Sequence, residues 1–359
     1  FALPILVTVL SVSARPQAAG AAPRGSVVSF APLDLWLALI PFVLRHRPRG
    51  LLLFETELWP FTLWLLRRFG IPVAVVSGRL SQRRWPRTRR LRPLLRDLLR
   101  GVDLVAAQGK GDAERFVFLG AKRVEVAGNL KYRPVTPPAE LPGFSAFVFV
   151  AGSLRLGEEC VLDAVRDLLA ESDEALAVVA PRHLREKEHW TRSLRERGLD
   201  ARARTQILLD GASEDRGATE LIRDLRRALG EARVLLVDTH GELSRWYGAG
   251  AAAFVGGTLA PIGGHSLFEP AACGVPVAFG PFTAGVQDVA EPLLRHGGGT
   301  RVRDGRDLSG WLLELCRNQP ARVLASQGAW RAAIEVGGAA ERTWRLLETL
   351  PWTRVEGRG

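Results

Sequence analysis

Short apolar runs alternate with helical patterns along nearly the whole chain. The helical patterns include Asp34–Arg45, Leu91–Leu99, Leu156–Leu169 and Ala218–Leu229, and each lies between two apolar runs. The runs that we predict as strands are Ile5–Leu10, Gly50–Phe54, Val73–Val76, Leu104–Ala107, Val124–Ala127, Ala146–Ala151, Ala175–Ala180, Arg233–Val237, Ala253–Val255 and Val275–Phe279. Strands that alternate with helices predict an α/β fold whose parallel sheets are connected by right-handed crossovers.

The first apolar run, Ile5–Val12, has two interpretations. An apolar run followed by small residues is typical of a secretory signal peptide, but residues 1–22 lack the basic start of such a peptide. The run is also rich in β-branched residues, which favours a buried strand. Because the chain begins at Phe1 and contains no Met, we expect its natural N-terminal segment to be missing.

A proline-rich stretch, residues 133–143, divides the chain. Its four prolines cannot continue a helix or donate to a sheet, so we predict a stiff linker between domains at residues 1–132 and 144–330. A last helical stretch, Gly328–Leu350, has no strand after it, and we expect residues 331–359 to pack back on the first domain. Two such domains would face a cleft at the carboxyl ends of their strands, where open α/β sheets bind ligands.

Composition narrows the classes of function. Apolar residues make up 47% of the chain and charged residues 24%, which excludes a globally disordered protein. No apolar run reaches the roughly 18 residues of a transmembrane helix. The 49 Lys and Arg exceed the 38 Asp and Glu, and the net charge of +11 suits nucleic acid, phospholipid headgroups or phosphorylated substrates. The three cysteines, Cys160, Cys273 and Cys316, show neither metal-ligand nor redox spacing and fit a reducing compartment.

The segment Phe254–Pro281 carries the most chemistry. It has the pattern of strand, glycine loop, helix and strand, and its two Gly-Gly pairs would let the backbone approach a ligand closely. We expect His265 and Ser266 to open the helix, whose free N–H groups and dipole suit an anion. Glu269, one turn further on, could accept hydrogen bonds from vicinal hydroxyls such as those of a ribose. The alternative is that the glycines only form turns and Glu269 is a helix N-terminal charge.

Other polar groups also follow predicted strands. Glu55 and Glu57 come directly after Gly50–Phe54, and they would point the same way if the backbone stayed extended. The alternative is a solvated loop whose acids cap the next helix. Three more polar segments with the same placement are Ala127–Lys131, Ala180–His183 and Val237–Leu243.

Taken together and in this order, these segments resemble the 3-deoxy-D-manno-octulosonic acid (Kdo) transferase family, the glycosyltransferases of the GT-B fold that act in lipopolysaccharide assembly. The matching motifs are Glu55–Pro60, Gly78–Ser81, Gly128–Lys131, Ala180–His183, Asp238–Leu243 and Gly256–Pro281. The resemblance implies two Rossmann-like parallel-sheet domains that face a cleft. The first domain would lie on the acceptor side and the second would hold the donor nucleotide.

The resemblance also implies the reaction and its residues. Kdo would move from CMP-Kdo to a lipid A precursor, lipid IVA, with inversion at the anomeric carbon and without a metal or other cofactor. Glu55 and Lys131 match family positions that stabilise the transition state, and the general base would be a Glu upstream of Phe1. The implied donor-binding residues are Pro181, Arg182, His240, Gly241, Glu242, Ser266, Leu267, Phe268 and Glu269.

The chain departs from the family pattern at several positions. Phe61 and Ser266 stand where the family has Asn, and Ser153–Arg155 stands where it has Ser-Thr-His. The family's general-base motif is not in the sequence, and loss of such a base lowers a rate by about 10²–10⁴. The alternatives are therefore another GT-B enzyme with a different donor, a nucleotide-sugar epimerase, and a fragment that binds the donor without catalysis.

Two segments are candidates for contact with a membrane surface. Arg83–Arg100 predicts a basic amphipathic helix, which either faces anionic headgroups or turns its leucines to the core and its arginines to water. Pro32–Arg45 would form a helix that is apolar nearly all round. Such a helix is either buried or forms a membrane-facing patch. With a lipid acceptor, we expect the chain at the cytoplasmic face of the bacterial inner membrane. The net charge alone would also suit nucleic acid, but the chain lacks clustered Lys and the aromatic repeats of RNA-binding modules, so we expect no such partner.

Overall fold

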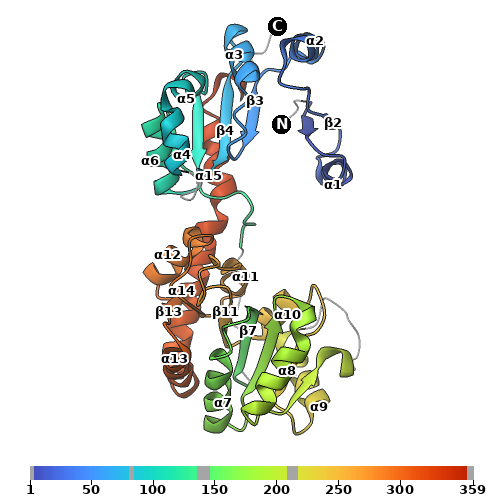
Figure 1. The fold of residues 1–359 in the computed structure, drawn as a ribbon, viewed down its shortest axis with the longest axis vertical. Coiled ribbons are helices and arrows are strands. Elements are labelled where there is room, and N and C mark those ends of the chain that lie inside the picture. Colours follow the sequence, from blue (N-terminus) through green and yellow to red (C-terminus); the bar gives the residue numbers. More distant parts are fainter. Residues whose placement is uncertain (1–3, 81–84, 136–145, 208–216, 354–359) are drawn as a thin grey trace. The chain divides into compact units, whose positions relative to one another are not determined.

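The chain folds into two compact units. A computed structural model describes residues 4–80, 85–135, 146–207 and 217–353. The first unit comprises Phe1–Gly128 with Glu341–Gly359, and the second comprises Asn129–Ala340 (Figure 1). Most of the predicted linker, residues 133–143, lies outside the described residues. The roles that the sequence assigns to the two domains stay predictions.

The first unit is built on parallel strands. In the described residues, one sheet has the order β3-β4-β5-β6, and β1 pairs with β2 in a separate small sheet. The strands are β1 (Leu6–Val9), β2 (Val27–Phe30), β3 (Leu51–Phe54), β4 (Val73–Gly78), β5 (Leu104–Ala107) and β6 (Val124–Val126). The helices are α1 (Ala14–Ala21), α2 (Trp36–His46), α3 (Pro60–Arg68), α4 (Trp85–Thr88), α5 (Arg92–Leu99) and α6 (Lys110–Leu119), with a 3₁₀ turn at Arg89–Leu91.

A carboxylate from before α2 caps α3. The side chain of Asp34 accepts hydrogen bonds from the backbone N–H groups of Phe61 (3.1 Å) and Thr62 (2.8 Å). These are first-turn N–H groups that have no partner inside the helix, and a nearby anion also suits the helix dipole. Pro60 opens α3 with a backbone angle that is already helical. Asp34 therefore ties α2 to α3 within the first unit.

The C-terminal segment belongs to the first unit. The described elements there are α15 (Ala339–Leu347) and a 3₁₀ turn at Pro351–Thr353. Arg342 donates from Nε to the carbonyl of Ala127 (3.0 Å), and Arg123 donates from Nη1 to the hydroxyl of Thr349 (2.8 Å). These bonds join the last helix to the strand and loop that end the first part of the unit.

The second unit has a larger parallel sheet. In the described residues its order is β13-β12-β11-β7-β8-β10-β9. The strands are β7 (Val148–Leu154), β8 (Leu176–Pro181), β9 (Ala201–Ala203), β10 (Val234–Leu236), β11 (Ala252–Val255), β12 (Val277–Phe279) and β13 (Gly299–Arg301). The helices are α7 (Val161–Glu171), α8 (Lys187–Glu196), α9 (Ala218–Leu229), α10 (Leu243–Ala249), α11 (Phe268–Ala272), α12 (Gln287–Arg295), α13 (Gly305–Arg317) and α14 (Gln319–Gly337), with 3₁₀ turns at Leu184–Glu186 and Arg204–Gln206.

Both faces of this sheet are buried. Along β7, Val148 and Val150 belong to one apolar cluster while Phe149 and Ala151 belong to the other. Alternate side chains of a strand point to opposite faces, so a strand covered on both faces is apolar at every position. This explains why β7 appears in the sequence as a continuous apolar run.

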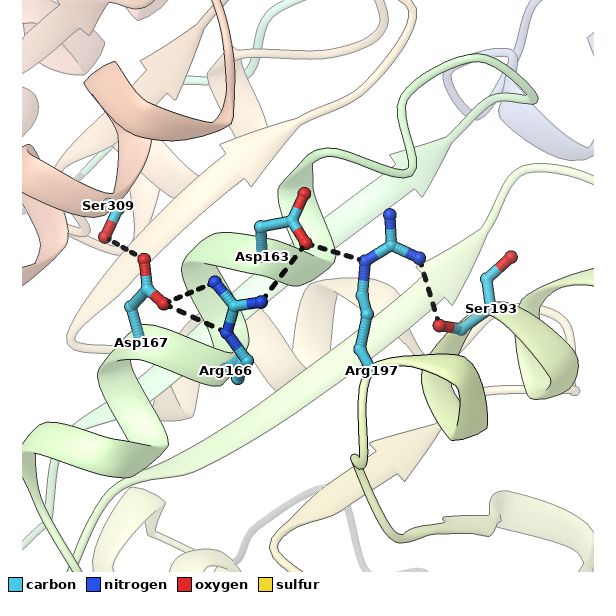
Figure 2. Close-up of polar contacts among 6 residues, drawn as sticks. All are labelled: Asp163, Arg166, Asp167, Ser193, Arg197 and Ser309. Carbon is cyan, nitrogen blue, oxygen red and sulfur yellow. Dashed lines mark hydrogen bonds and ion pairs between the residues drawn. The ribbon is translucent and has the colours of Figure 1, made fainter.

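Two ion-paired carboxylates hold α7 to its neighbours (Figure 2). Asp163 accepts from Nε of Arg197, which follows α8, at 2.9 Å. Asp167 accepts from the hydroxyl of Ser309 on α13 at 2.7 Å and from Arg166. Burial by itself would raise the pKa of Asp167, but the hydrogen bonds from Ser309 and Arg166 hold that pKa below its ordinary value.

A close approach of backbones fixes the position of α14. A Cβ added at Gly298 would lie 1.9 Å from the backbone nitrogen of Ala329. The same contact from the other side leaves no room at Gly328, where a Cβ would lie 2.3 Å from the carbonyl oxygen of His296. Only glycine fits at such a crossing, so these two residues set how near α14 comes to the start of β13.

Most of the sequence predictions for the elements are confirmed. Every predicted strand overlaps an observed one, and α9 has the predicted bounds. The pattern missed β2, β9 and β13, because polar residues or glycine (Ser29, Arg202, and Gly299, Thr300 and Arg301) interrupt their apolar character. The predicted final helix is wrong in its continuity, since α14 ends at Gly337 and α15 starts at Ala339.

Two predictions about the first unit need correction: the burial of its first strand and the leucine stripe of its basic stretch. The expected burial of the first strand is wrong: within the described residues β1 pairs only with β2, and its side chains stay partly or wholly exposed. Of the basic stretch, residues 83 and 84 lie outside the described residues. In α5, Leu99 is buried, whereas the side chain of Leu94 is 62% exposed, so the leucine stripe faces the core only in part. In the second unit, the three cysteines are unpaired and half-buried.

Candidate functional site

A small pocket lies at the carboxyl ends of β7 and β8, beside the loop after β10. It encloses about 80 Å³. The residues that line it are Ser153, Ala180, Pro181, Arg182, Leu184, Val237, Thr239, His240, Gly241 and Leu243. The structure thus brings together two segments that are far apart in the sequence, and both contain predicted site residues.

The sheet order places this pocket beside a switch point of the second unit. From β7 the chain moves to β8, β9 and β10 on one side, and it then returns to β11 on the other side of β7. The switch point of the sheet is therefore the place where β7 and β11 are neighbours. Such a switch point is the usual ligand site of an open α/β sheet.

The loop after β10 contains Asp238, whose side chain is held by hydrogen bonds, and His240, which is exposed. The side chain of Asp238 accepts from the backbone N–H of Thr205 (2.9 Å), from the Thr205 hydroxyl (2.6 Å) and from Lys187. Burial would raise the pKa of Asp238, but these hydrogen bonds outweigh it and lower that pKa. His240 and Gly241 are exposed, whereas Glu242 forms an ion pair with Nε of Arg204 at 2.8 Å. Asp238 therefore holds the loop, and His240 is free to reach a ligand.

The glycine-rich segment after β11 differs from its prediction. The helix α11 begins at Phe268, so His265 and Ser266 lie in the loop before it and do not open it. Gly263 and Gly264 have φ angles of +104° and +91°, so the backbone directly before His265 is not a right-handed helix. The predicted helix start at His265 was wrong, since Leu267 is the N-cap and Phe268 the first helical residue.

The four predicted site residues of this segment point in different directions. Glu269 is exposed in the first turn of α11, and Ser266 is partly exposed. The side chain of Leu267 is fully buried, so Leu267 can offer a ligand only its backbone. Phe268 packs its ring against Tyr132, with 4.7 Å between the ring centroids. The polar members of the set are thus accessible, and the apolar members hold the helix in place.

Basic side chains gather beside the pocket. Arg155 donates from Nη1 to Nε2 of His183 at 2.5 Å, and the backbone N–H of Arg182 donates to the carbonyl of Leu154 at 2.9 Å. Burial first, and then the charges of Arg182, Arg155 and His183, lower the pKa of His265. Within the described residues, no carboxylate lies within salt-bridge distance of Arg155 or Arg182. The geometry suits an anionic ligand.

The two predicted catalytic residues are both exposed. Glu55 lies in the first unit and has a φ of +57°, so the backbone does not stay extended and the expected common direction of Glu55 and Glu57 is not supported. Lys131 lies in the second unit, with Nζ 4.7 Å from the centroid of the Tyr132 ring. Its backbone N–H donates to Oδ1 of Asn129 at 3.1 Å, which fixes the turn that carries it.

Sequence reasoning missed two buried polar residues beside the pocket, Glu158 and Thr258. Both are fully buried and hydrogen-bonded to loop backbone. A carboxylate just after a strand and next to Gly157 was the available signal for Glu158. Among the described residues, no group of three His, Cys, Asp or Glu could hold a metal ion. The expectation that no metal is required stays a prediction.

Comparison with known proteins identifies the family. A family model described as 3-deoxy-D-manno-octulosonic-acid transferase (kdotransferase) matches residues 2–133. A 3-deoxy-D-manno-octulosonic acid transferase of Bordetella pertussis is 32% identical over 364 residues, which is 96% of this chain and 81% of the relative. The chain belongs to the 3-deoxy-D-manno-octulosonic acid transferase family. A second relative with that name, from Aquifex aeolicus, is 29% identical over 87% of this chain and 78% of its own length.

Solved structures agree on the fold. HepE of Anabaena, in complex with UDP, has a TM-score of 0.57 at 14% identity and covers 96% of this chain and 91% of its own. A UDP-N-acetylglucosamine 2-epimerase has a TM-score of 0.54 at 12% identity over 99% of this chain and 90% of its own. The predicted GT-B fold is therefore confirmed, and the Kdo transferase family makes the chain a glycosyltransferase. No helix of the described residues is long and apolar enough to cross a membrane.

Proposed function

We propose that this chain transfers Kdo from CMP-Kdo to a lipid A precursor, lipid IVA, with inversion at the anomeric carbon. The observation that carries the proposal is the pocket that joins Pro181 and Arg182 to His240 and Gly241 at the carboxyl ends of β7 and β8. These are donor-binding positions of the family by motif, and the chain is 32% identical over 96% of its length to a member. The donor would be a nucleotide sugar, and no metal would be required.

The donor nucleotide would be held by charge and by hydroxyl contacts. Arg182 is exposed beside the pocket and has no carboxylate partner among the described residues, which suits it to a phosphate. Exposed Glu269 and partly exposed Ser266 would accept from, or donate to, the ribose. His240 and Gly241 would contact the nucleotide from the loop after β10, while Leu267 would contribute its backbone. Phe268 would act by packing against Tyr132, and Glu242 would act through its ion pair with Arg204.

Catalysis would depend on charge placed near the reacting bond. As the acceptor hydroxyl attacks the anomeric carbon, negative charge passes to the departing CMP phosphate. The ammonium of Lys131, which is exposed, would offset this charge or that of the sugar carboxylate, and Glu55 would stabilise the positive charge that develops on the sugar. Both roles come from the family positions that these residues match.

The acceptor suggests work at a membrane surface. The first unit exposes apolar side chains on and next to α2, including Trp36 and Leu37, which are 59% and 68% exposed. Basic residues follow them at Arg45, Arg47 and Arg49. Apolar side chains next to arginines favour binding to anionic lipid. We therefore propose that the chain acts at the cytoplasmic face of the bacterial inner membrane, as an enzyme of the cell envelope.

Protection by CMP tests the donor. We expect CMP to raise the melting temperature of the full chain and Glu269→Ala to abolish this rise, because the ribose contact is lost. Glu196→Ala, an exposed carboxylate at the end of α8, is the control and should keep the rise. If a UDP-sugar protects and CMP does not, the chain is another GT-B enzyme, such as an epimerase. If CMP protects but no Kdo reaches lipid IVA, the chain binds donor without catalysis.

A further inference from the structure

One buried carboxylate joins the loop after β7 to the loop after β11. The side chain of Glu158 is fully buried. Its Oε2 accepts from the backbone N–H groups of Arg155 (2.9 Å) and Gly257 (2.9 Å). Its Oε1 accepts from the backbone N–H groups of Thr258 (3.1 Å) and Leu259 (3.0 Å). Four backbone donors thus satisfy a buried charge that would otherwise be very unfavourable.

The position of Glu158 in the sheet gives this contact a functional meaning. Strands β7 and β11 are neighbours, and the switch point of the second unit lies between them. Ser153 of β7 lines the pocket, whereas the candidate donor-binding residues Ser266 and Glu269 follow β11. Because one N–H comes from the first loop and three come from the second, Glu158 fixes the distance between the two loops.

The two loops approach each other too closely for side chains. A Cβ added at Gly256 would lie 2.4 Å from the carbonyl oxygen of Ser153 and 2.6 Å from Oε2 of Glu158. The backbone N–H of Gly256 donates to the carbonyl of Gly152 at 2.9 Å. The arrangement is therefore a defined backbone contact rather than a loose loop.

Each loop is hydrogen-bonded to a residue close in sequence to a candidate donor-binding residue. On one side, the N–H of Gly264 donates to the carbonyl of Gly257 at 2.8 Å, and Gly264 stands two residues before Ser266. On the other side, Arg155 contacts His183, which follows Arg182 directly. A shift of either loop would therefore change the distance between Arg182 and Ser266.

We propose that Glu158 is a positioning residue for the donor nucleotide. Its carboxylate holds the loops after β7 and β11 at the separation at which Arg182 and Ser266 contact one nucleotide. This inference rests on the proposed function. A glutamine at this position would not replace Glu158, because its amide nitrogen would face two backbone N–H donors that now share one oxygen.

The test compares CMP affinity in variants of the full chain. The variant is Glu158→Gln, and the control is Asp167→Asn, a carboxylate on α7 that contacts Ser309 and Arg166 away from the loops (Figure 2). The control also loses a hydrogen-bonded charge in the same unit, so it matches a general loss of stability. The dissociation constant of CMP is measured by calorimetry at a temperature well below the melting point of every variant.

We expect Glu158→Gln to weaken CMP binding at least about tenfold and Asp167→Asn to change it less than about twofold, since only the first moves the loops. In turnover, Glu158→Gln should raise the KM for CMP-Kdo and leave kcat at saturating donor within about twofold. Unchanged CMP affinity, or a fall in kcat without a change in KM, overturns the role of Glu158. Failure of the unaltered chain to bind CMP overturns the proposed function, and this inference with it.

Discussion

Thr258→Val should destabilise the second unit more than the small change in side-chain shape suggests. Thr258 is fully buried, and its hydroxyl donates to the carbonyl of Val255 (2.7 Å) and accepts from the backbone N–H of Gly280 (2.8 Å). Valine has nearly the same shape, but it places a methyl group where the hydroxyl was. The N–H of Gly280 is then buried against a carbon atom.

The size of the effect follows from these two bonds. A buried donor left without a partner costs about 1–3 kcal/mol, and the second lost bond adds about 1 kcal/mol, so the expected loss is about 2–4 kcal/mol. For a domain of this size each kcal/mol lowers the melting temperature by roughly 2–4 °C, which gives a fall of roughly 5–15 °C.

The assay is thermal unfolding followed by circular dichroism, without ligand. Thr258→Ser is the matched control: it keeps the hydroxyl and loses only a buried methyl group, worth about 1 kcal/mol. We expect the order unaltered chain, Thr258→Ser, Thr258→Val in falling melting temperature. A Thr258→Val variant that melts within about 2 °C of the unaltered chain, or above Thr258→Ser, would refute the reasoning that these two bonds hold the loop.

Three further predictions concern other parts of the chain. Asp34→Ala should lower the stability of the first unit by about 1–2 kcal/mol and speed amide exchange in the first turn of α3, where equal exchange rates would contradict its capping role. The pKa of His265 lies below its ordinary 6.5 because of burial and nearby cations, so the unfolded chain takes up the proton first. The stability that depends on neutral His265 is therefore fully present above the ordinary pKa of 6.5 and is lost as the pH falls below it. His265→Gln should reduce the loss of melting temperature between about pH 7.5 and 5.5. Gly298→Ala would put a Cβ 1.9 Å from the nitrogen of Ala329 and should cost at least about 3 kcal/mol in urea unfolding, whereas Gly310→Ala in α13, with open space around it, should cost nothing.

The sequence was sufficient for the fold class because a strand buried on both faces leaves a continuous apolar run. Runs such as Val73–Val76 and Leu104–Ala107 are fully buried strands in the structure. Strands β9 (Ala-Arg-Ala) and β13 (Gly-Thr-Arg) carry no such run, so the apolar pattern could not show them. The family was also within reach, since its motifs lie in unbroken segments of the chain.

The tertiary structure decided which residues of those motifs can meet a ligand. The sequence placed Leu267 and Glu269 in one site, but only the packed fold shows that the first is buried and the second exposed. Glu158 shows the same limit, because three of its hydrogen-bond partners lie about a hundred residues further along the chain. Local sequence determines strands and helices through short-range periodicity, whereas the strand order brings distant loops together, and only there do charge, burial and hydrogen bonding define a site.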